Sequence, residues 1–355
     1  AKRDAFFTVA DTAFEQARKL DPTGLAILET YADYLRARGQ NDKAVRLLAE
    51  SKEPRLLWRH HFRTGSYAEA RRLLEAMYRD SAGRSEALKG LVLVAEAMSD
   101  RAGAKTYSDE LVTLEDNAAN RIMQLQTYLN MGLVEEAEQK LRSLKEKYPG
   151  EPRAMLMEAL VAAGRHRWAE ATDGIDKCIR AAGPETDAGR EYTARKAQLL
   201  TTAYNATSDK THLRKAIAVY ESLRVKWPKN SSVLNNLAYL LAQNNERLAE
   251  ALEYARTAVE QEPQEPSYWD TYGYLLYRNG KHTQAAQSLV AALQKYEVRG
   301  MASTDAYEHL GLVQEALGDR AQARDAYRRA LEAGGSAMPD AARRRIEAAL
   351  GRLAE

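Results

Sequence analysis

The sequence predicts an all-α fold in which helical hairpins are stacked as a solenoid, and three observations lead to this fold class. Alanine, leucine, glutamate, arginine and glutamine dominate the 355 residues, and these residue types favour helices. Apolar side chains recur at the i, i+3, i+4 and i+7 spacing of amphipathic helices. The same pattern returns about every 34 residues along the chain, which is typical of an array of helical repeats.

The first stretch, residues 1–22, ends with "VADTAFEQARKLDP". In it, Ala10, Phe14, Ala17 and Pro22 follow the spacing of the second helix of a repeat. The first helix of that repeat is missing. We therefore predict that residues 1–22 are the back half of a repeat, and we expect more repeats upstream in the native protein.

Residues 23–335 are predicted to form a tandem array of about nine repeats. The first helix of each reads large–x–x–Leu–small–x–x–large, and the second reads small–x–x–x–large–x–x–small before a closing Pro or Gly. The clearest copy lies in "PSYWDTYGYLLYRNGKHTQAAQSLVAALQKY", from Pro266 onward. One copy is stretched, because "NATSDKT" at residues 205–211 is predicted to be a longer loop between its two helices.

Residues 336–355 are predicted to form a C-terminal cap helix. Pro339 lies near its start, and Ile346, Leu350 and Leu353 form one apolar stripe beside a run of three arginines. A solenoid needs such a polar-faced helix at its open end.

Alanine occupies many positions that the pattern predicts to be buried, including Ala238 and Ala251. Small side chains let antiparallel helices approach closely, and a leucine there would overpack the contact at a cost of about 1–3 kcal/mol. Pro228 and Pro263 are predicted to follow the ends of second helices, because proline inside a helix removes a hydrogen bond and clashes.

Over nearly its whole length the chain resembles the tetratricopeptide repeat family, on the repeat pattern and period given above. The resemblance implies a right-handed superhelix whose concave face is lined by the first helices and binds a protein or peptide. The phrases "LNNLAYLLAQ" and "WDTYGYLLYRNGK" look like those of bacterial, often envelope-associated, proteins of this family. This suggests a location in the bacterial envelope or periplasm, or in the cytoplasm.

Composition and motifs exclude several functional classes. The chain has 52 Lys+Arg against 50 Asp+Glu, which argues against a nucleic-acid partner, and no stretch reaches a membrane span, so no direct membrane insertion is expected here. There is no HExxH, no paired CxxC and no GxxxxGK[ST]. Adjacent residues such as His60 and His61 do not converge on one metal. We expect no enzyme activity, no catalytic residue, no metal site and no cofactor.

Some relatives clamp a C-terminal carboxylate with asparagines and basic residues from three first helices. Here Asn235 and Asn236 match part of that pattern. Thr271 replaces the second helix's asparagine, and Asp305 and His309 lie where the basic pair belongs. The resemblance therefore does not extend to a chaperone clamp.

The candidate binding residues are those of the first helices that fall just beside the packing stripe. They are Arg55, Arg59 and Arg63 near the N-terminus; Met123, Leu156, Met157 and Leu160 in the middle; and Asn236, Tyr239, Tyr274 and Tyr277 toward the C-terminus. The apolar middle is the predicted centre of partner binding, and the arginine row would suit an acidic segment. Alternatively, the apolar middle packs against second helices, or the assumed register is shifted by one residue.

The function favoured by these observations is a non-enzymatic scaffold or adaptor that binds a partner on its concave face, in the assembly of an envelope or export complex. The alternative is a regulatory or substrate-recruiting region of a larger enzyme or secretion protein. The sequence names neither the partner nor the oligomeric state.

Overall fold

The computed structural model describes residues 2–21, 24–335 and 338–354, and these residues form twenty α-helices and no strand. The predicted all-α repeat fold is confirmed. The chain divides into two compact units, Ala1–Ala154 and Met155–Glu355. Each unit is described separately.

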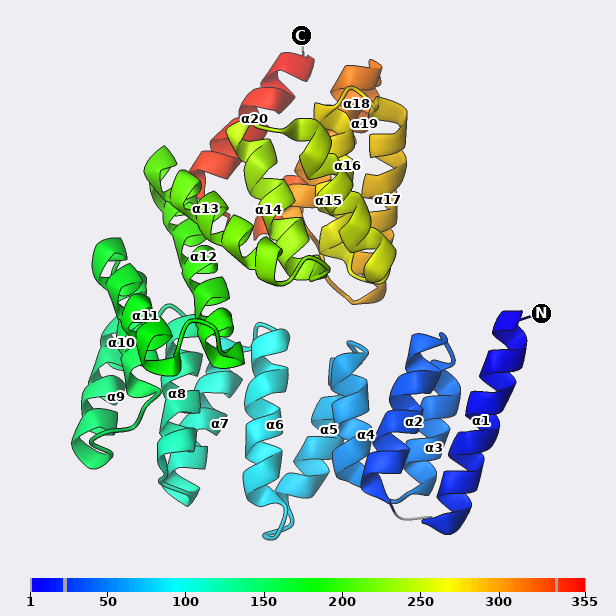
Figure 1. Ribbon diagram of the computed structural model, residues 1–355, viewed down its shortest axis with the longest axis vertical. Helices are drawn as coiled ribbons and strands as arrows, with labels where there is room; N and C mark the ends of the chain where they lie inside the picture. The colour runs from blue at the N-terminus through cyan, green and yellow to red at the C-terminus, as the bar shows by residue number, and fades with distance from the viewer. Residues whose placement is uncertain (1, 22–23, 336–337, 355) are drawn as a thin grey trace. The chain divides into compact units, whose positions relative to one another are not determined.

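The first unit is a row of antiparallel hairpins in which α2 packs on α3, α4 on α5, α6 on α7 and α8 on α9 (Figure 1). Its helices are α1 (Lys2–Leu20), α2 (Leu25–Ala37), α3 (Asn41–Glu50), α4 (Pro54–Arg63), α5 (Tyr67–Tyr78), α6 (Arg84–Ala97), α7 (Arg101–Leu114), α8 (Ala118–Asn130) and α9 (Val134–Lys147).

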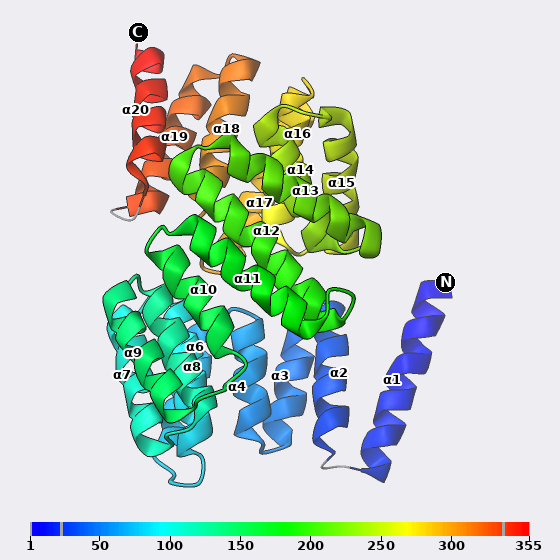
Figure 2. The same ribbon diagram turned by 60° about the vertical axis from the view of Figure 1, so that its left-hand side comes forward.

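In the second unit, α12 packs on α13, α14 on α15, α16 on α17 and α18 on α19, and α20 lies against α19 (Figure 2). Its helices are α10 (Ala154–Gly164), α11 (Trp168–Ala182), α12 (Asp187–Thr207), α13 (Lys210–Lys226), α14 (Ser231–Asn244), α15 (Leu248–Gln261), α16 (Pro266–Arg278), α17 (His282–Val298), α18 (Thr304–Leu317), α19 (Arg320–Gly334) and α20 (Asp340–Ala354).

Small residues lie where two helices of a hairpin approach most closely. Ala238 and Ala251 are fully buried, as the repeat pattern predicts. At Gly311 of α18, an added Cβ would lie 2.5 Å from Cε1 of Tyr327 on α19. At Gly273 of α16, it would lie 2.7 Å from Cγ of Leu289 on α17. In these two hairpins, the glycine of the first helix leaves space that a large side chain of the second helix fills. The distance between the two helices therefore depends on the small residue and on the large one.

The predicted ends of two second helices are confirmed. α13 ends at Lys226 and α15 ends at Gln261, in each case two residues before a proline. The prediction of a long loop at residues 205–211 is wrong. There α12 continues to Thr207, Ser208 adopts a left-handed conformation with φ of 58°, and the Asp209 carboxylate caps α13 by accepting a hydrogen bond from the Thr211 amide. Local capping therefore closes the turn with two residues, and α12 gains length.

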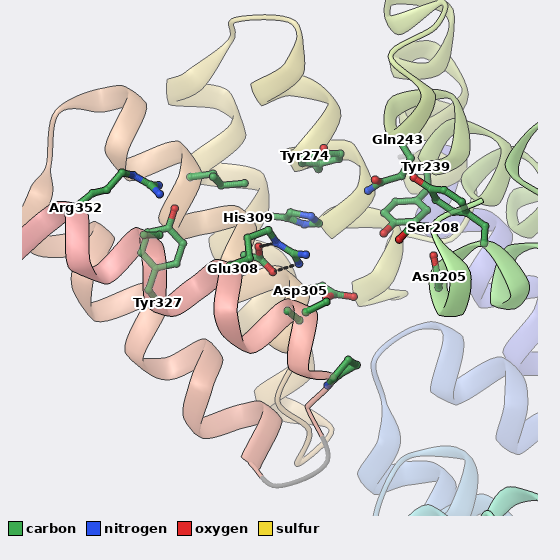
Figure 3. Close-up of a pocket in the computed structure, with 17 residues that line it drawn as sticks. Asn205, Ser208, Tyr239, Gln243, Tyr274, Asp305, Glu308, His309, Tyr327 and Arg352 are labelled. Atoms are coloured by element: carbon green, nitrogen blue, oxygen red, sulfur yellow. Dashed lines mark hydrogen bonds and ion pairs between the residues drawn. The ribbon is translucent and has the colours of Figure 1, made fainter. Parts of the chain in front are cut away.

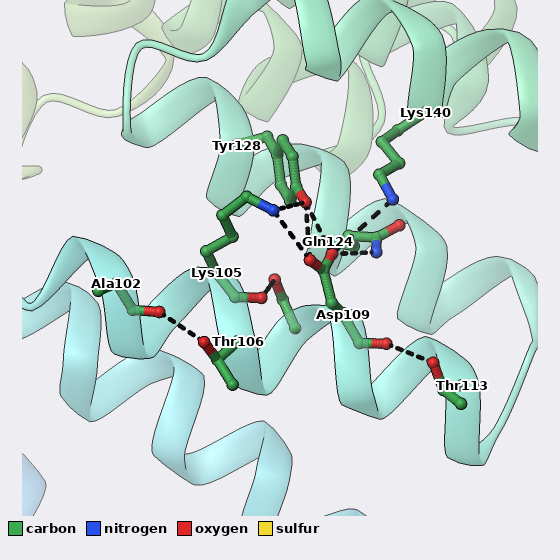
Figure 4. A network of polar contacts seen from close by, with 9 residues as sticks. Ala102, Lys105, Thr106, Asp109, Thr113, Gln124, Tyr128 and Lys140 are labelled. Carbon is green, nitrogen blue, oxygen red and sulfur yellow. Dashed lines mark hydrogen bonds and ion pairs between the residues drawn. The ribbon is translucent and has the colours of Figure 1, made fainter.

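A polar network ties α7, α8 and α9 of the first unit together around Asp109 (Figure 4). Its carboxylate accepts hydrogen bonds from the Tyr128 hydroxyl at 2.8 Å, from Gln124 Nε2 at 2.7 Å and from Lys105 Nζ at 3.1 Å. Lys140 Nζ lies 3.8 Å away. Burial opposes ionisation of Asp109, but these hydrogen bonds outweigh it and lower the pKa of the carboxyl group.

Candidate functional site

The second unit contains a cavity of about 560 Å³ on the side formed by its first helices (Figure 3). The end of α12, the helices α14, α16 and α18, and the terminal helix α20 contribute its walls. Tyr239 and Gln243 come from α14, and Tyr274 comes from α16. Asn205 and Ser208 reach the cavity because α12 runs on through the segment that the sequence predicted to be a loop.

Two further hollows adjoin this cavity. A hollow of about 250 Å³ shares Tyr239 with it. A larger hollow of about 630 Å³ shares Gln198, Tyr220 and Asn236 with the small one. Because neighbouring hollows share wall residues, the three lie next to one another along α12 and α14. We refer to this set of three hollows as the trough.

An oriented imidazole lies in the wall of the cavity. His309 Nδ1 is 2.8 Å from Oδ1 of Asp270, and the His309 ring stacks on Tyr274 with centroids 4.3 Å apart. Burial opposes protonation of this ring, but the carboxylates of Asp270, Asp305 and Glu308 outweigh it and raise the pKa of His309. The surrounding carboxylates therefore favour the protonated form of this ring.

The arginines of the cavity come from α20 and are paired. Arg345 contacts both carboxylate oxygens of Glu308, with Nη2 to Oε2 at 2.7 Å. Arg352 lies 3.7 Å from Oε1 of Glu315, which also accepts a hydrogen bond from the Tyr327 hydroxyl. These pairs fix α20 against α18, and leave little unpaired arginine charge in the cavity.

The predicted arginine row forms salt bridges within the first unit. Arg59 Nη2 is 2.9 Å from Glu86 of α6, and Arg63 Nη1 is 3.1 Å from Asp33 of α2. Arg55 Nε is 3.0 Å from Glu53 at the start of its own helix. Arg59 and Arg63 therefore bridge neighbouring hairpins.

Two of the four residues of the predicted apolar centre are core, and two are half-buried. Leu156 and Met157 are exposed by only 7% and 3%, so they pack inside the second unit and offer a partner almost no surface. Leu160, on the same helix, is half-buried, and so is Met123 in the first unit. The alternative that this strip packs against other helices therefore describes Leu156 and Met157.

The C-terminal candidates lie closest to the trough. Tyr239 and Tyr274 line the cavity, and Asn236 lines the two adjoining hollows. Asn236 Nδ2 donates a hydrogen bond to the Tyr220 hydroxyl at 3.2 Å. Tyr277 contacts the rings of Tyr274 and His282. The structure thus brings together three of the predicted residues, and they come from the C-terminal group.

Sequence reasoning missed two walls of the cavity. The α20 arginines were assigned only to a solvated cap, and the end of α12 was assigned to a loop. The spacing of Arg345 and Arg352, seven residues apart on one helical face, was an available signal for the first. For the wall formed by the end of α12, the alanine within "NATSDKT" favours a helix that continues. The polar residues around it favour a turn instead, so the sequence alone does not predict the longer helix.

The side chains that line the trough are mainly tyrosines, amides, hydroxyls and charged groups. No group of three or more potential metal ligands occurs among the described residues. Over the same residues, His309 Nε2 makes no hydrogen bond to a hydroxyl or thiol that could serve as a nucleophile. Cys178 is buried, and burial raises the pKa of its thiol, as expected for an inert packing residue. None of the described helices combines the length and apolarity needed to span a bilayer.

Comparison with known proteins gives the family of two segments of the chain. The family model for the tetratricopeptide repeat matches residues 208–266 and 272–338, which extend from α13 to α19 and include most of the walls of the cavity. These two segments of the chain are tetratricopeptide repeats. Tetratricopeptide repeats are protein-interaction modules and are generally not catalytic.

The chain is 28% identical over 219 residues to a TPR repeat-containing protein of Pseudomonas aeruginosa. The match covers 61% of this chain and 34% of that protein, so the chain spans about a third of the length of this curated relative.

Three solved structures are similar to this chain. A thermophilic TPR protein of Thermus thermophilus is 17% identical at a TM-score of 0.42, over 56% of this chain and 98% of that one. MamA from Desulfovibrio magneticus is 20% identical at a TM-score of 0.39, over 51% and 95% of the two chains. A tetratricopeptide repeat protein from Parabacteroides merdae is 13% identical at a TM-score of 0.37, over 86% and 98%.

Proposed function

We propose that this protein is a non-enzymatic scaffold whose second unit binds an extended or helical segment of a partner protein in the trough. The observation that carries the proposal is that three hollows lie next to one another along α12 and α14, and that α16 and α18 contribute further walls to the cavity among them. A trough of this kind, with half-buried tyrosines and amide side chains in its walls, offers apolar area and hydrogen-bonding groups to a bound chain.

The proposal moves the centre of binding away from the predicted apolar strip. Tyr239 and Tyr274 supply large, rigid contact surfaces that lose little conformational entropy on binding. Gln243, Asn205 and Asn236 supply polar groups that can pair with a peptide backbone. The arginine row of the first unit is already occupied by intramolecular salt bridges, so we expect it to contribute to stability more than to partner capture.

Photo-crosslinking in living cells tests this proposal. A photoreactive phenylalanine analogue replaces Asn205 or Gln243, which line the cavity, and in a control it replaces Val225, which is 73% exposed on the second helix α13. We expect one and the same partner to be crosslinked from both cavity positions and not from Val225. Crosslinks from Val225 alone would contradict the proposal, because they would place the partner on second helices.

The identity of the crosslinked partner also separates the two biological roles considered from the sequence. A component of an envelope or export complex would support the assembly role. If the binding partner is instead a catalytic domain of the same native protein, the chain is a substrate-recruiting or regulatory region of a larger enzyme.

A further inference from the structure

One half of the cavity contains a carboxylate, Asp305, that makes no ion pair with any described residue. Desolvation in the cavity, together with the charges of Asp270 and Glu308, raises the pKa of this carboxyl group. The nearby His309 and Arg345 act to lower the pKa, but they are outweighed.

In Figure 3, the Asp305 carboxylate points toward the wall that contains Tyr239, Ser208 and Asn205, whereas Arg352 lies on the far side with Tyr327. The two helices behind that wall, α12 and α14, contribute only uncharged side chains to the cavity. We refer to Asp305 and this wall as the acidic half of the cavity.

Asp305 differs from the other carboxylates around it. Glu308 is held by Arg345, Glu315 lies next to Arg352, and Asp270 contacts His309. Asp305 makes no ion pair or hydrogen bond with any residue that the structure describes, and its residue is exposed. The Asp305 carboxylate therefore has no ion-pair partner among the described residues and can form an ion pair with a ligand.

Tyr239 is the second group of the acidic half without a partner. Within the described part of the chain, its hydroxyl makes no hydrogen bond and its ring has no stacking or cation contact. By contrast, Tyr274 stacks on His309 and accepts a hydrogen bond from Arg278 at 2.9 Å. Burial and then the charge of Asp305 raise the pKa of Tyr239 above its usual range, which shows that the carboxylate acts on this ring.

We propose that the acidic half of the cavity binds a lysine or arginine side chain of the partner segment, with Asp305 as its counter-ion and Tyr239 as its aromatic and hydrogen-bonding contact. The inference rests on the proposed function, and it names the partner's chemistry. A cation near the face of a tyrosine and beside a carboxylate gains from both interactions.

Charge complementarity favours this occupant over an acidic one. A partner carboxylate entering the cavity would meet Asp305 and Glu308, while the two arginines that could receive it are already paired. Separating Arg345 from Glu308 would leave a buried carboxylate uncompensated, since Glu308 is only 5% exposed. A cation, by contrast, completes the one open ion pair without breaking another.

The test is a selection from a random peptide library with the full chain as bait. Peptides are kept only if binding is lost in Asn205→Trp, which fills the cavity from an exposed position. We expect a lysine or arginine at one fixed position of the selected peptides. Each selected peptide is then compared with a twin in which glutamine replaces that residue, and we expect the basic peptide to bind about tenfold more tightly.

The variant Asp305→Asn should remove the preference between the twins, while Glu246→Gln, an exposed carboxylate in the turn between α14 and α15, should leave it unchanged. Equal affinities of the twins for the parent chain, or an acidic residue at the fixed position, would overturn the cation proposal and leave the trough as the binding site. A library that gives no peptide blocked by Asn205→Trp would overturn the proposed function as well.

Discussion

At the scale of single residues, periodicity predicts burial but not polar pairing. The repeat pattern placed Ala238 and Ala251 in the core, and both are fully buried. It did not show that Arg63 pairs with Asp33, because those residues lie thirty positions apart and meet only when two hairpins stack. The burial of Met157 was missed for a related reason, since a shift of one position on a helix rotates a side chain by about 100°.

The buried His60 gives a prediction for the pH dependence of stability. Its residue is 0% exposed, Nε2 lies 2.7 Å from Asn41 Oδ1, and Nδ1 has no partner. Burial, followed by the charges of His61 and Arg63, lowers the pKa of His60 from 6.5 to about 4. The unfolded chain therefore takes up this proton first, so the stabilising effect of the neutral ring is complete above pH 6.5 and is lost as the pH falls toward 4.

Urea unfolding at a series of pH values measures this effect. As the pH falls from 6.5 to about 4, the free energy of unfolding of the parent chain should decrease. We expect this decrease to be about 3 kcal/mol larger than the decrease for His60→Gln. His166→Gln, at an exposed histidine, is the matched control and should behave like the parent. Parallel pH profiles for His60→Gln and the parent would show that His60 does not titrate as described.

The Asp109 network gives a second prediction at this scale. Asp109→Asn removes the negative charge that Tyr128, Lys105 and Gln124 contact. We therefore expect the free energy of unfolding to fall by about 1–2 kcal/mol. This loss is smaller than that expected for a fully buried charge, because the site is partly open to solvent. The measurement is urea unfolding at neutral pH. Asp173→Asn, at an exposed carboxylate of α11 paired only with Lys177, should change stability by less than about 0.5 kcal/mol. Equal losses for the two variants would contradict a special role for the network.

At the scale of helices, the sequence predicted element type well and element ends unevenly. Ends marked by proline, after α13 and α15, were correct. The end of α12 was wrong because "NATSDKT" is polar and turn-like in composition, whereas a single left-handed Ser208 and the Asp209 cap are enough to close the turn. That error concealed the wall of the cavity formed by Asn205.

The close approach within hairpins is tested by Ala238→Leu on α14. The larger side chain must push α14 away from its neighbours, so we expect a loss of about 1–3 kcal/mol in unfolding free energy. Ala218→Leu, at an exposed position of α13, adds the same atoms and should change stability by less than about 0.5 kcal/mol. Chemical denaturation followed by circular dichroism gives both values. If the two variants are equally stable, close packing does not set the distance between these helices.

At the scale of the whole molecule, we propose that the hairpins from α2/α3 to α18/α19 are the repeats and that α20 is the cap. Each helix contacts mainly its neighbours in the chain, so stability should be close to a sum over hairpins. A chain truncated after Ala302, which lacks α18 to α20, should keep the helices upstream folded. Its helical circular dichroism should fall only in proportion to the residues removed. A disproportionate loss of helical signal would contradict a repeat array.

The location of the proposed binding surface was only partly accessible from sequence. Tyr239, Tyr274 and Asn236, which line the hollows, were predicted because first-helix residues beside the packing stripe face the hollow side of a repeat. The contribution of α20 was not found, because a cap helix has no repeat register from which its facing residues can be read. Asp305 was seen in the sequence only as a mismatch to a carboxylate clamp, and its isolation from basic partners required the structure.

The central claim is that the trough of the second unit is the partner-binding surface. The most direct test is the dissociation constant of the crosslinked partner for two tryptophan variants, Asn205→Trp in the cavity wall and Val225→Trp on the exposed side of α13. Both positions are exposed, so both variants should fold. We predict that Asn205→Trp weakens binding at least about tenfold, or 1.4 kcal/mol, and that Val225→Trp binds as the parent does. Unchanged affinity for Asn205→Trp, or a loss confined to Val225→Trp, would contradict the claim.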